Sequence, residues 1–495
     1  MLDLAIAVSM LLLVVLGCAD ASAAETLRIY SGPPGEPASP DFTVEANGQP
    51  VFVYQAKVRH EIAKPPGSIW THEMGAKAEV ASFACFDFEG KVAVAVKPNR
   101  PFQKATLLPT SYGIQPKIEG GIVRFEIDQP RKLTLLLHGS AGASPSQDGS
   151  DQRPLHLFAN PMETGAPKQG DPNVIYFGPG IHKTGPIEVK SGQTVYIAGG
   201  AIVRGQILPD EKPTHSARTG LNHYGPLIHV QNARNVRVCG RGILDGSDMP
   251  HASRALVLVA NSSDVQVDGI VIRDSPNWAV SMHGSDRVSV ANVSQISGRL
   301  NSDGINSVNS RAIRIRNCFV RNRDDSIVVK TTQPTGDASD ILVEGCVIWN
   351  DWGYALGITY ETRAPIHGVT FRDCDVLDAL FWALGIHVVD SATMSDIRFE
   401  NIRVERTRGG LIRLGITHDM WATDKERGHI RSILFDNVRF TGGGTPASEI
   451  LGLDAAHRVE DVTFRNLQIG GQAVRNAAQG WFRINDRTAN IRFGE

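Results

Sequence analysis

The chain has 495 residues, of which 42% are hydrophobic and 21% charged, and its formal net charge is −2. This balance excludes the strongly basic surface that nucleic acids or anionic membranes attract, so we expect no nucleic-acid partner. Single cores rarely exceed about 250 to 300 residues, which predicts more than one domain. The 49 glycines and an aromatic content of 7% favour an all-β chain with many tight turns.

Residues 1–24 read as a signal peptide. The apolar run "LAIAVSMLLLVVLG" is too short to span a membrane comfortably, and the small residues "ADASAAE" follow it. Cleavage after Ala23 or Ala24 fits this pattern, although the start "MLDL" lacks the usual basic residue. The stretch "VLGC" also allows a lipoprotein anchored through Cys18. We therefore expect a secreted or periplasmic protein without a membrane span.

Residues 25–160 predict a β-sandwich. Three stretches carry hairpin signals: "FTVEANGQPVFVY" around Asn47-Gly48, "SFACFDFEGKVAVAVK" around Glu89-Gly90, and "IVRFEIDQPRKLTLLLHG". The segment 139–154 is rich in Ser, Gly and Asp, so we interpret it as an exposed loop or part of a link.

From residue 172 to the end, a repeat of roughly 28 residues predicts a right-handed parallel β-helix. Two apolar residues at i and i+2 precede Gly, Asn or Asp at i+4, as in "VRVCGRGI" at 236, "VQVDGIVI" at 265, "IRIRNCFV" at 313, "IRFENIRV" at 397 and "VTFRNLQI" at 462. Period-2 alternation excludes a helical solenoid. The residue at i+4 should tolerate a left-handed backbone at a repeated bend.

The same register stacks three cysteines on successive coils: Cys318, Cys346 and Cys374. Buried thiols filling a narrow core are one interpretation, and a disulfide between neighbouring coils is the other. No Cys-x-x-Cys or Cys/His spacing is present, so metal binding through thiolates is not expected.

A second strand in each coil aligns as "WAVSMH" at 278, "DGINSV" at 303, "DSIVVK" at 325, "YALGIT" at 354, "WALGIH" at 382 and "GLIRLG" at 410. Its third and fifth positions should point inward and form two apolar stripes, the first of them Val280, Ile305, Ile327, Leu356, Leu384 and Ile412. The outward positions place Ser281, Asn306 and Arg413 in one column and His283, Lys330 and His387 in another.

Asp303 and the pair Asp324-Asp325 come at the starts of two adjacent outward-facing strands. Like charges this close push at least one pKa upward, so a reason for them is needed. Turn formation is one, because Asp-Gly is a common turn sequence. The other is glycosidase chemistry, in which one protonated aspartic acid donates a proton while its neighbours activate water. Lys330 would then hold a substrate oxygen or balance charge, or be an exposed lysine without a role.

These residues resemble the parallel β-helix glycoside hydrolases. The similarity rests on "NSDGINSVNS", on "RNRDDSIVVK" about 20 residues later, and on "GRGILDGS" and the glycine-rich strands from 176 to 205 upstream. It is strongest for family 49, the dextranases and isopullulanase, which also carry an N-terminal β-sandwich, and extends to family 28, the polygalacturonases. The resemblance implies an inverting mechanism with three catalytic aspartates: Asp303, Asp324 and Asp325. It implies Asp324 as the general acid, with Asp303 and Asp325 holding the nucleophilic water.

Two motifs of the polygalacturonases are missing. Their Gly-His-Gly corresponds to "WGYAL" with Tyr354, and their carboxylate-binding Arg-x-Lys to "WALGIH". A galacturonate substrate is therefore in doubt, although Arg413 or Arg363 could bind a carboxylate. Aromatic residues that could stack on sugars or pack under loops are Trp352, Tyr354, Trp382 and Trp421. His283 and His387, exposed in this register, could bind sugar hydroxyls or be surface residues, and Asn306 completes the candidate substrate-binding set.

The function predicted from the sequence is a secreted inverting O-glycosidase of an α-linked polysaccharide or oligosaccharide. We expect it to work as a monomer without a cofactor or metal. Two alternatives stay open: a polysaccharide lyase on the same fold, with a calcium cage of carboxylates, and a non-catalytic glycan-binding β-helix. The insertion "THDMWATDKERGHI" at 417–430 could close one end of a cleft and direct the enzyme to chain ends.

Overall fold

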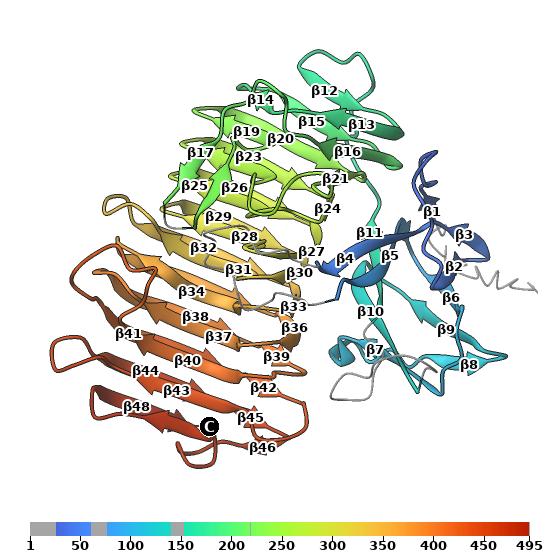
Figure 1. Cartoon of the computed structure of the whole chain (residues 1–495). Coiled ribbons are helices and arrows are strands. Elements are labelled where there is room, and N and C mark those ends of the chain that lie inside the picture. The colour runs from blue at the N-terminus through green and yellow to red at the C-terminus, as the bar shows by residue number, and fades with distance from the viewer. Residues whose placement is uncertain (1–25, 61–76, 140–152, 218, 495) are drawn as a thin grey trace, which may run out of the picture.

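The computed structural model describes residues 26–60, 77–139, 153–217 and 219–494. The described chain forms a β-sandwich, followed by a parallel β-helix against whose side the sandwich packs (Figure 1). The expected signal segment, including Cys18, lies outside the described residues. The fold class predicted from the sequence is confirmed.

The sandwich has two sheets around one apolar core. Its six-stranded sheet contains β1 (Thr26–Ile29), β4 (Val53–Arg59), β5 (Glu79–Glu89), β7 (Lys104–Leu108), β10 (Arg131–His138) and β11 (Leu155–Pro161). Its five-stranded sheet contains β2 (Phe42–Ala46), β3 (Gln49–Val51), β6 (Val92–Pro98), β8 (Lys117–Glu119) and β9 (Ile122–Ile127). The helix η1 (Thr110–Tyr112) is a single 3₁₀ turn. None of the described helical segments is long and apolar enough to cross a membrane.

Only one of the three expected hairpins forms. Asn47 and Gly48, both at positive φ, join β2 to β3, and Ala46 pairs with Gln49. The turn at Glu89-Gly90 instead carries the chain from β5 in one sheet to β6 in the other, and the link from β9 to β10 crosses in the same way. The prediction was wrong there because turn residues reverse the chain equally well within a sheet and between two sheets.

The β-helix has three parallel sheets, here called the first, second and third sheet in the order in which a coil visits them. The first sheet contains β12 (Val174–Phe177), β15 (Thr194–Ile197), β20 (Arg234–Gly240), β23 (Ser263–Asp268), β26 (Asp286–Ala291), β29 (Arg311–Arg316), β32 (Ala338–Glu344), β35 (Ile366–Arg372), β38 (Thr393–Glu400), β41 (His429–Asp436), β44 (Val459–Arg465) and β48 (Thr488–Gly494).

The second sheet contains β13 (Gly180–Thr184), β16 (Ala201–Gly205), β21 (Ile243–Asp245), β24 (Val271–Arg273), β27 (Ser294–Leu300), β30 (Phe319–Arg323), β33 (Val347–Asn350), β36 (Asp375–Ala379), β39 (Arg403–Val404), β42 (Arg439–Phe440), β45 (Gln468–Ile469) and β46 (Gln472–Ala473). The third contains β14 (Ile187–Val189), β19 (Ile228–Gln231), β22 (Val257–Ala260), β25 (Val280–His283), β28 (Ile305–Val308), β31 (Ile327–Thr331), β34 (Tyr354–Thr362), β37 (Trp382–Val388), β40 (Gly410–Ile416), β43 (Ala447–Leu451) and β47 (Phe482–Ile484).

The repeat read from the sequence is the register of the first sheet. Val236 pairs with Val265, Val265 with Val288, and Val288 with Ile313, and the same position continues through the later repeats to Val462. The residues at i+4 all have a positive φ, between 51° and 129°: Gly240, Gly269, Asn292, Asn317, Gly345, Asp373, Asn401, Asn437 and Asn466. The Gly, Asn and Asp of the repeat are thus set by a left-handed bend in every coil.

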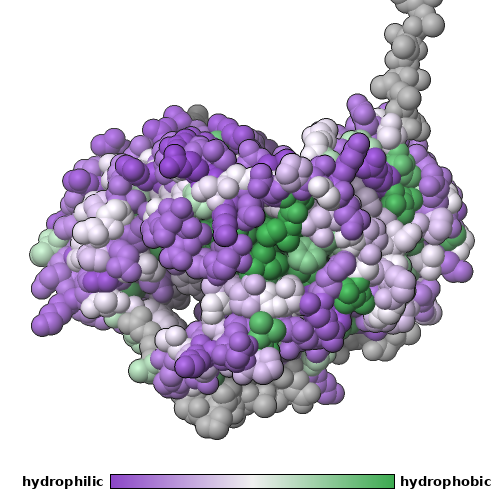
Figure 2. Space-filling view, turned by 90° about the horizontal axis from the view of Figure 1, so that it is seen from above, coloured by the Kyte–Doolittle hydropathy of each residue, from purple (hydrophilic) through white to green (hydrophobic). Residues whose placement is uncertain are grey.

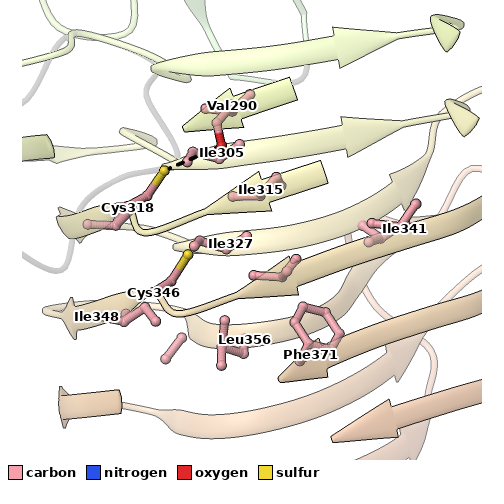
Figure 3. Close-up of a cluster of buried hydrophobic side chains, with 14 of the residues drawn as sticks. Val290, Ile305, Ile315, Cys318, Ile327, Ile341, Cys346, Ile348, Leu356 and Phe371 are labelled. Atoms are coloured by element: carbon pink, nitrogen blue, oxygen red, sulfur yellow. Dashed lines mark hydrogen bonds between the residues drawn. The ribbon is translucent and has the colours of Figure 1, made fainter. Parts of the chain in front are cut away.

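The core between the sheets consists of columns of apolar side chains stacked on successive coils. The predicted inward stripe is one of these columns. Ile305, Ile327 and Leu356 follow one another on neighbouring coils of the third sheet (Figure 3). Cys318, Cys346 and Cys374 are fully buried, and none of the described cysteines forms a disulfide. The interpretation as stacked core thiols is confirmed.

The sandwich contacts the second sheet through aromatic rings and buried ion pairs. Phe158 of β11 lies 5.1 Å from Phe319 of β30, measured between ring centroids. Arg241 Nε lies 2.9 Å from Asp87 Oδ2, and both side chains are buried.

At the upper end of the β-helix, β12 is half-buried along its length, and hydrophobic residues are visible among hydrophilic ones (Figure 2). A short hairpin of β17 (Thr214–Ser216) and β18 (Leu221–His223) extends from the second coil, between β16 and β19.

Replacing Asn437 tests the role of the left-handed bend. Its Nδ2 donates to Asn401 Oδ1 at 2.9 Å, and its Oδ1 accepts from Asn466 Nδ2 at 3.0 Å. Asn437→Ala should lower the free energy of unfolding by about 2–3 kcal/mol, because it loses these bonds and strains the bend. Asn437→Gly, which keeps the backbone conformation, should lose only about 1 kcal/mol. Equal losses in urea denaturation of the two variants would contradict this role.

Candidate active site

Asp303, Asp324 and Asp325 meet where the chain turns from the second sheet into the third. Asp303 lies two residues before β28, and the pair lies between β30 and β31 on the next coil. One carboxylate oxygen from each lies within 4.8 Å of the others. Asp303 and Asp325 are buried, and Asp324 is partly exposed. The three aspartates that the sequence singled out therefore form one cluster.

Three donors hold the Asp325 carboxylate, and one acceptor position of its Oδ1 is left for a further donor such as water. Its Oδ1 accepts from the backbone N–H of Tyr354 at 3.0 Å. Its Oδ2 accepts from Thr359 Oγ1 at 2.6 Å and from Lys330 Nζ at 3.0 Å. Three donors, one of them charged, fix the orientation of this carboxylate.

Asp324 and Asp303 have fewer partners. Asp324 accepts two backbone N–H groups, those of Asn301 at 3.0 Å and of Asp325 at 2.9 Å. Burial and the neighbouring charge of Asp325 raise the pKa of Asp324 to about 7. Asp303 accepts from Asn306 Nδ2 at 2.9 Å, and burial together with Asp324 raises its pKa well above the usual value. A proton is thus held in this cluster near neutral pH.

Lys330 lies among the carboxylates rather than in solvent. Its Nζ is 3.0 Å from Asp325 Oδ2, 3.0 Å from Glu361 Oε2 and 3.9 Å from Asp303 Oδ2. Burial alone would lower the pKa of Lys330, but these three carboxylates raise it well above its usual value. Of the interpretations of Lys330 that the sequence left open, a role in balancing charge fits this geometry. The interpretation as an exposed lysine without a role is wrong.

Two asparagines on adjacent coils hold the turn that carries Asp324 and Asp325. Asn322 and Asn350 pair in the second sheet. Asn322 Nδ2 lies 3.0 Å from the carbonyl of Asp324 and 2.9 Å from that of Asp325, and Asn350 Nδ2 lies 2.7 Å from the carbonyl of Asp324. The two asparagines supply the hydrogen bonds that the Asp324 carbonyl accepts, whereas the Asp325 carbonyl also accepts from the backbone N–H of Gly304 at 2.9 Å. Sequence reasoning missed this ladder, although "RNRDD" and "IWNDW" carry asparagine at the same place in successive coils.

Two glycines let the coils approach closely at the cluster. A Cβ on Gly304 would lie 2.1 Å from the carbonyl oxygen of Ser326 on the next coil. Gly353, at φ +81°, lies below the aspartate pair, where a Cβ would come within 2.8 Å of Asp325 Oδ1. The Asp-Gly sequence at 303–304 is therefore explained by close packing of one coil on the next.

The aspartates open into a cleft of about 390 Å³. Its lining contains the three aspartates, Lys330, Glu361 and Arg413, and a set of aromatic and apolar side chains: Trp278, Trp352, Tyr354, Tyr360, Phe381, Trp382, Met420 and Trp421. A larger hollow of about 740 Å³ lies on the sandwich, over β6 and β9, far from this cluster in the chain's fold. We assign the chemistry to the smaller cleft because the carboxylates converge there.

Four of the seven predicted substrate-binding residues line the cleft: Lys330, Tyr354, Trp382 and Arg413. Asn306 is buried and reaches the site only through its bond to Asp303. His283 borders a different hollow, beside Asn309 and Gln333. His387, predicted to be exposed, is buried and donates to or accepts from Thr417 Oγ1 at 2.7 Å. Its outward position is covered by Tyr360, whose ring centroid lies 4.9 Å away.

Glu361, Tyr360 and Trp278 are cleft residues that sequence reasoning missed. β34 continues to Thr362, beyond the aligned six residues, and the register with β31 shifts between Val329 and Thr331. This irregularity turns Glu361 toward Lys330. A period-2 pattern gives no signal for such a shift.

A cleft in the side of a parallel β-helix, with clustered carboxylates and aromatic walls, defines a glycoside hydrolase of the parallel β-helix class. The chain belongs to glycosyl hydrolases family 28, whose family model matches residues 225–480. It is 21% identical over 273 residues to a probable polygalacturonase of Vitis vinifera, an alignment that covers 50% of this chain and 51% of the relative. The chain thus spans about half the length of the curated relative that it matches.

Two solved structures share the fold. An exopolygalacturonase from Thermotoga maritima superposes with a TM-score of 0.52 and 19% identity, covering 65% of this chain and 83% of that one. Dex49A from Penicillium minioluteum gives a TM-score of 0.64 and 16% identity, covering 94% of this chain and 96% of that one. The expected similarity to both groups of β-helix hydrolases is confirmed, and the likeness to Dex49A extends over the sandwich as well.

Lys330→Met tests the charge balance of the cluster. Removing the cation leaves buried carboxylates uncompensated, so the free energy of unfolding should fall by about 3–5 kcal/mol. Lys183→Met, at an exposed position of β13, should change the free energy of unfolding by no more than about 0.5 kcal/mol. Urea denaturation at neutral pH measures both variants. If Lys330→Met lowers the free energy of unfolding no more than Lys183→Met does, the role of Lys330 in charge balance is contradicted.

Proposed function

We propose that this chain is an inverting glycoside hydrolase that cleaves an α-linked polysaccharide or oligosaccharide. The observation that carries the proposal is the convergence of three carboxyl groups, with nearest oxygens within 4.8 Å, at the base of an aromatic-walled cleft. Glycoside hydrolysis needs one carboxyl group that donates a proton and another that activates a nucleophile.

Asp324 is assigned as the general acid. It is the most accessible of the three aspartates, and its pKa of about 7 keeps a large share of it protonated at neutral pH. A proton donor of this kind must reach the glycosidic oxygen, and Asp324 lines the cleft. Asp303 and Asp325, deeper in the site, hold the attacking water.

Inversion is favoured by how Asp325 is held rather than by the spacing alone. Inverting enzymes usually separate their two carboxyl groups by about 6.5–9.5 Å and retaining enzymes by about 5–5.5 Å. The nearest oxygens here lie within 4.8 Å, which is close to the retaining value. Attack on the sugar would, however, require a carboxylate free to approach it, and Asp325 is fixed by Tyr354, Thr359 and Lys330. Such a carboxylate suits the role of a base that orients water.

The insertion after β40 supports action at chain ends. Trp421 of this insertion packs, together with Trp352, against Ala252 and Leu300. Leu300 ends β27, which lies four coils before β39 in the second sheet. The insertion therefore reaches back along the cleft past the coil that carries Asp324. A cleft covered in this way admits the end of a chain more readily than its middle.

Export is part of the proposal. The apolar run and small residues of 4–25 support a secreted or periplasmic enzyme, which suits a glycan substrate outside the cytoplasm. Fractionation of cells that express the full-length chain tests this, and retention of all activity in the cytoplasm would oppose it.

The direct test is hydrolysis of a panel of α-glucans, galactans and pectins by the wild type beside Asp324→Asn. We expect the wild type to release single sugar units from the chain end. NMR at early times should show that the anomeric configuration of the released sugar is inverted. Asp324→Asn should be slower by about 10²–10⁴, the usual contribution of general acid catalysis.

Three outcomes would contradict the proposal. A retained anomer would reject the inverting mechanism, and mixed oligosaccharides from the first minutes would reject action at chain ends. An unsaturated product that disappears with a chelator would identify a lyase instead of a hydrolase.

A further inference from the structure

Carboxyl groups outnumber cations in the lining of the cleft. Besides the three aspartates, Glu361 contributes a carboxylate, and its side chain is 22% exposed. Among the lining residues that the structure describes, the cations are Lys330 and Arg413. Four carboxyl groups thus face two cations.

Both cations of the lining already lie beside carboxylates of the protein. Lys330 is buried, and its ammonium group is shared by Asp325, Glu361 and the carbonyl of Thr359. Arg413 lies over the ring of Trp382, 5.6 Å from its centroid, and its Nε is 3.7 Å from Glu449 Oε2. Glu449 also pairs with Arg483, whose Nη2 lies 2.6 Å from its Oε1.

The coils that follow the aspartates present uncharged side chains at their outward positions. Beyond Lys330 in this column come Thr359, His387 and Gly415, and the neighbouring column contains Gly357 and Gly385 before Arg413. His387 is uncharged at neutral pH because burial, together with Arg413 and Lys330, lowers its pKa to about 3. Up to Arg413, the described outward side chains of these two columns therefore offer hydrogen bonds and surface but no positive charge.

We propose, resting on the hydrolase function above, that the sugar units bound in this cleft are uncharged and that Glu361 is the residue that selects them. Lys330 occupies Oε2 of Glu361, and Oε1 accepts no hydrogen bond from the described residues. That oxygen can accept a sugar hydroxyl, whereas a sugar carboxylate in the same place meets repulsion in a site of low dielectric constant. The faces of Trp352 and Trp382 suit the C–H faces of neutral sugar rings.

The experiment uses matched pairs of glycans. Each uronate oligosaccharide of the panel is compared with its carboxyl-reduced counterpart, which has the same linkage and ring stereochemistry and differs only at C6. We expect the wild type to cleave the reduced member of a pair with a kcat/KM at least ten-fold higher. Equal or faster cleavage of the uronate would overturn the inference and leave the hydrolase function standing. Failure to cleave any glycan of either series would overturn both.

Variants assign the selection to a residue. Glu361→Gln should narrow the ratio of kcat/KM between reduced glycan and uronate at least three-fold, whereas Glu361→Asp, which keeps the charge, should preserve it. A general loss of folding or catalysis lowers both rates and leaves this ratio unchanged. Arg413→Gln should change the ratio less than two-fold. A selective loss of uronate cleavage in Arg413→Gln would show that Arg413 receives a carboxylate and would overturn the inference.

Discussion

The site depends on the stacking of parallel coils, which puts equivalent residues of neighbouring turns only about 4.8 Å apart. Asp303 on one coil and Asp325 on the next lie one above the other, and their burial makes the mutual repulsion large. The fold meets this cost in two ways. Lys330 from the strand that follows neutralises part of the charge, and Asp324 holds a proton to higher pH than a free aspartic acid would. The proton that the proposed mechanism needs on Asp324 is therefore a consequence of the geometry that assembles the cluster.

The sandwich supports this geometry from the other side of the coil. Phe158 packs on Phe319, and His156 lies 3.2 Å from Arg321. Both partners belong to β30, the strand that leads directly into Asp324 and Asp325. On the inner side of the same turn, Asn322 fixes the carbonyls of the aspartate pair. The turn is thus held by buried contacts along the whole of β30, which limits the motion of its two carboxylates.

The sequence predicted the β-helix well because its signals are local and repeated. The left-handed bend needs Gly, Asn or Asp in every coil, and the core needs alternating apolar residues, so the pairing from Val236 to Val462 could be read in advance. The column of Asp303 and Asp325 followed from that register. The sequence pattern did not predict which side chains at outward positions are buried. Lys330 and His387 point away from the core, yet both are buried, and the ring of Tyr360 lies close to each of them.

The prediction of two hairpins was wrong for a different reason. Tertiary packing decides whether two successive strands pair in one sheet or lie in different sheets. Glu361 was missed because a register shift in β34, invisible to a two-residue period, turns it into the cleft. Both failures arise where the chain departs from a regular repeat. At the site, that departure adds a carboxylate which the motif does not contain.

The central claim is that crowding of buried carboxylates keeps Asp324 protonated near neutral pH. Carboxyl ¹³C NMR of aspartate-labelled protein, titrated through the acid and neutral range, measures this directly, with Asp324→Asn assigning the signal. We expect Asp324 to titrate near pH 7, and Asp325→Asn, which removes the neighbouring charge, to move this midpoint downward. Titration of Asp324 near pH 4 in the wild type, or a midpoint unmoved in Asp325→Asn, would contradict it.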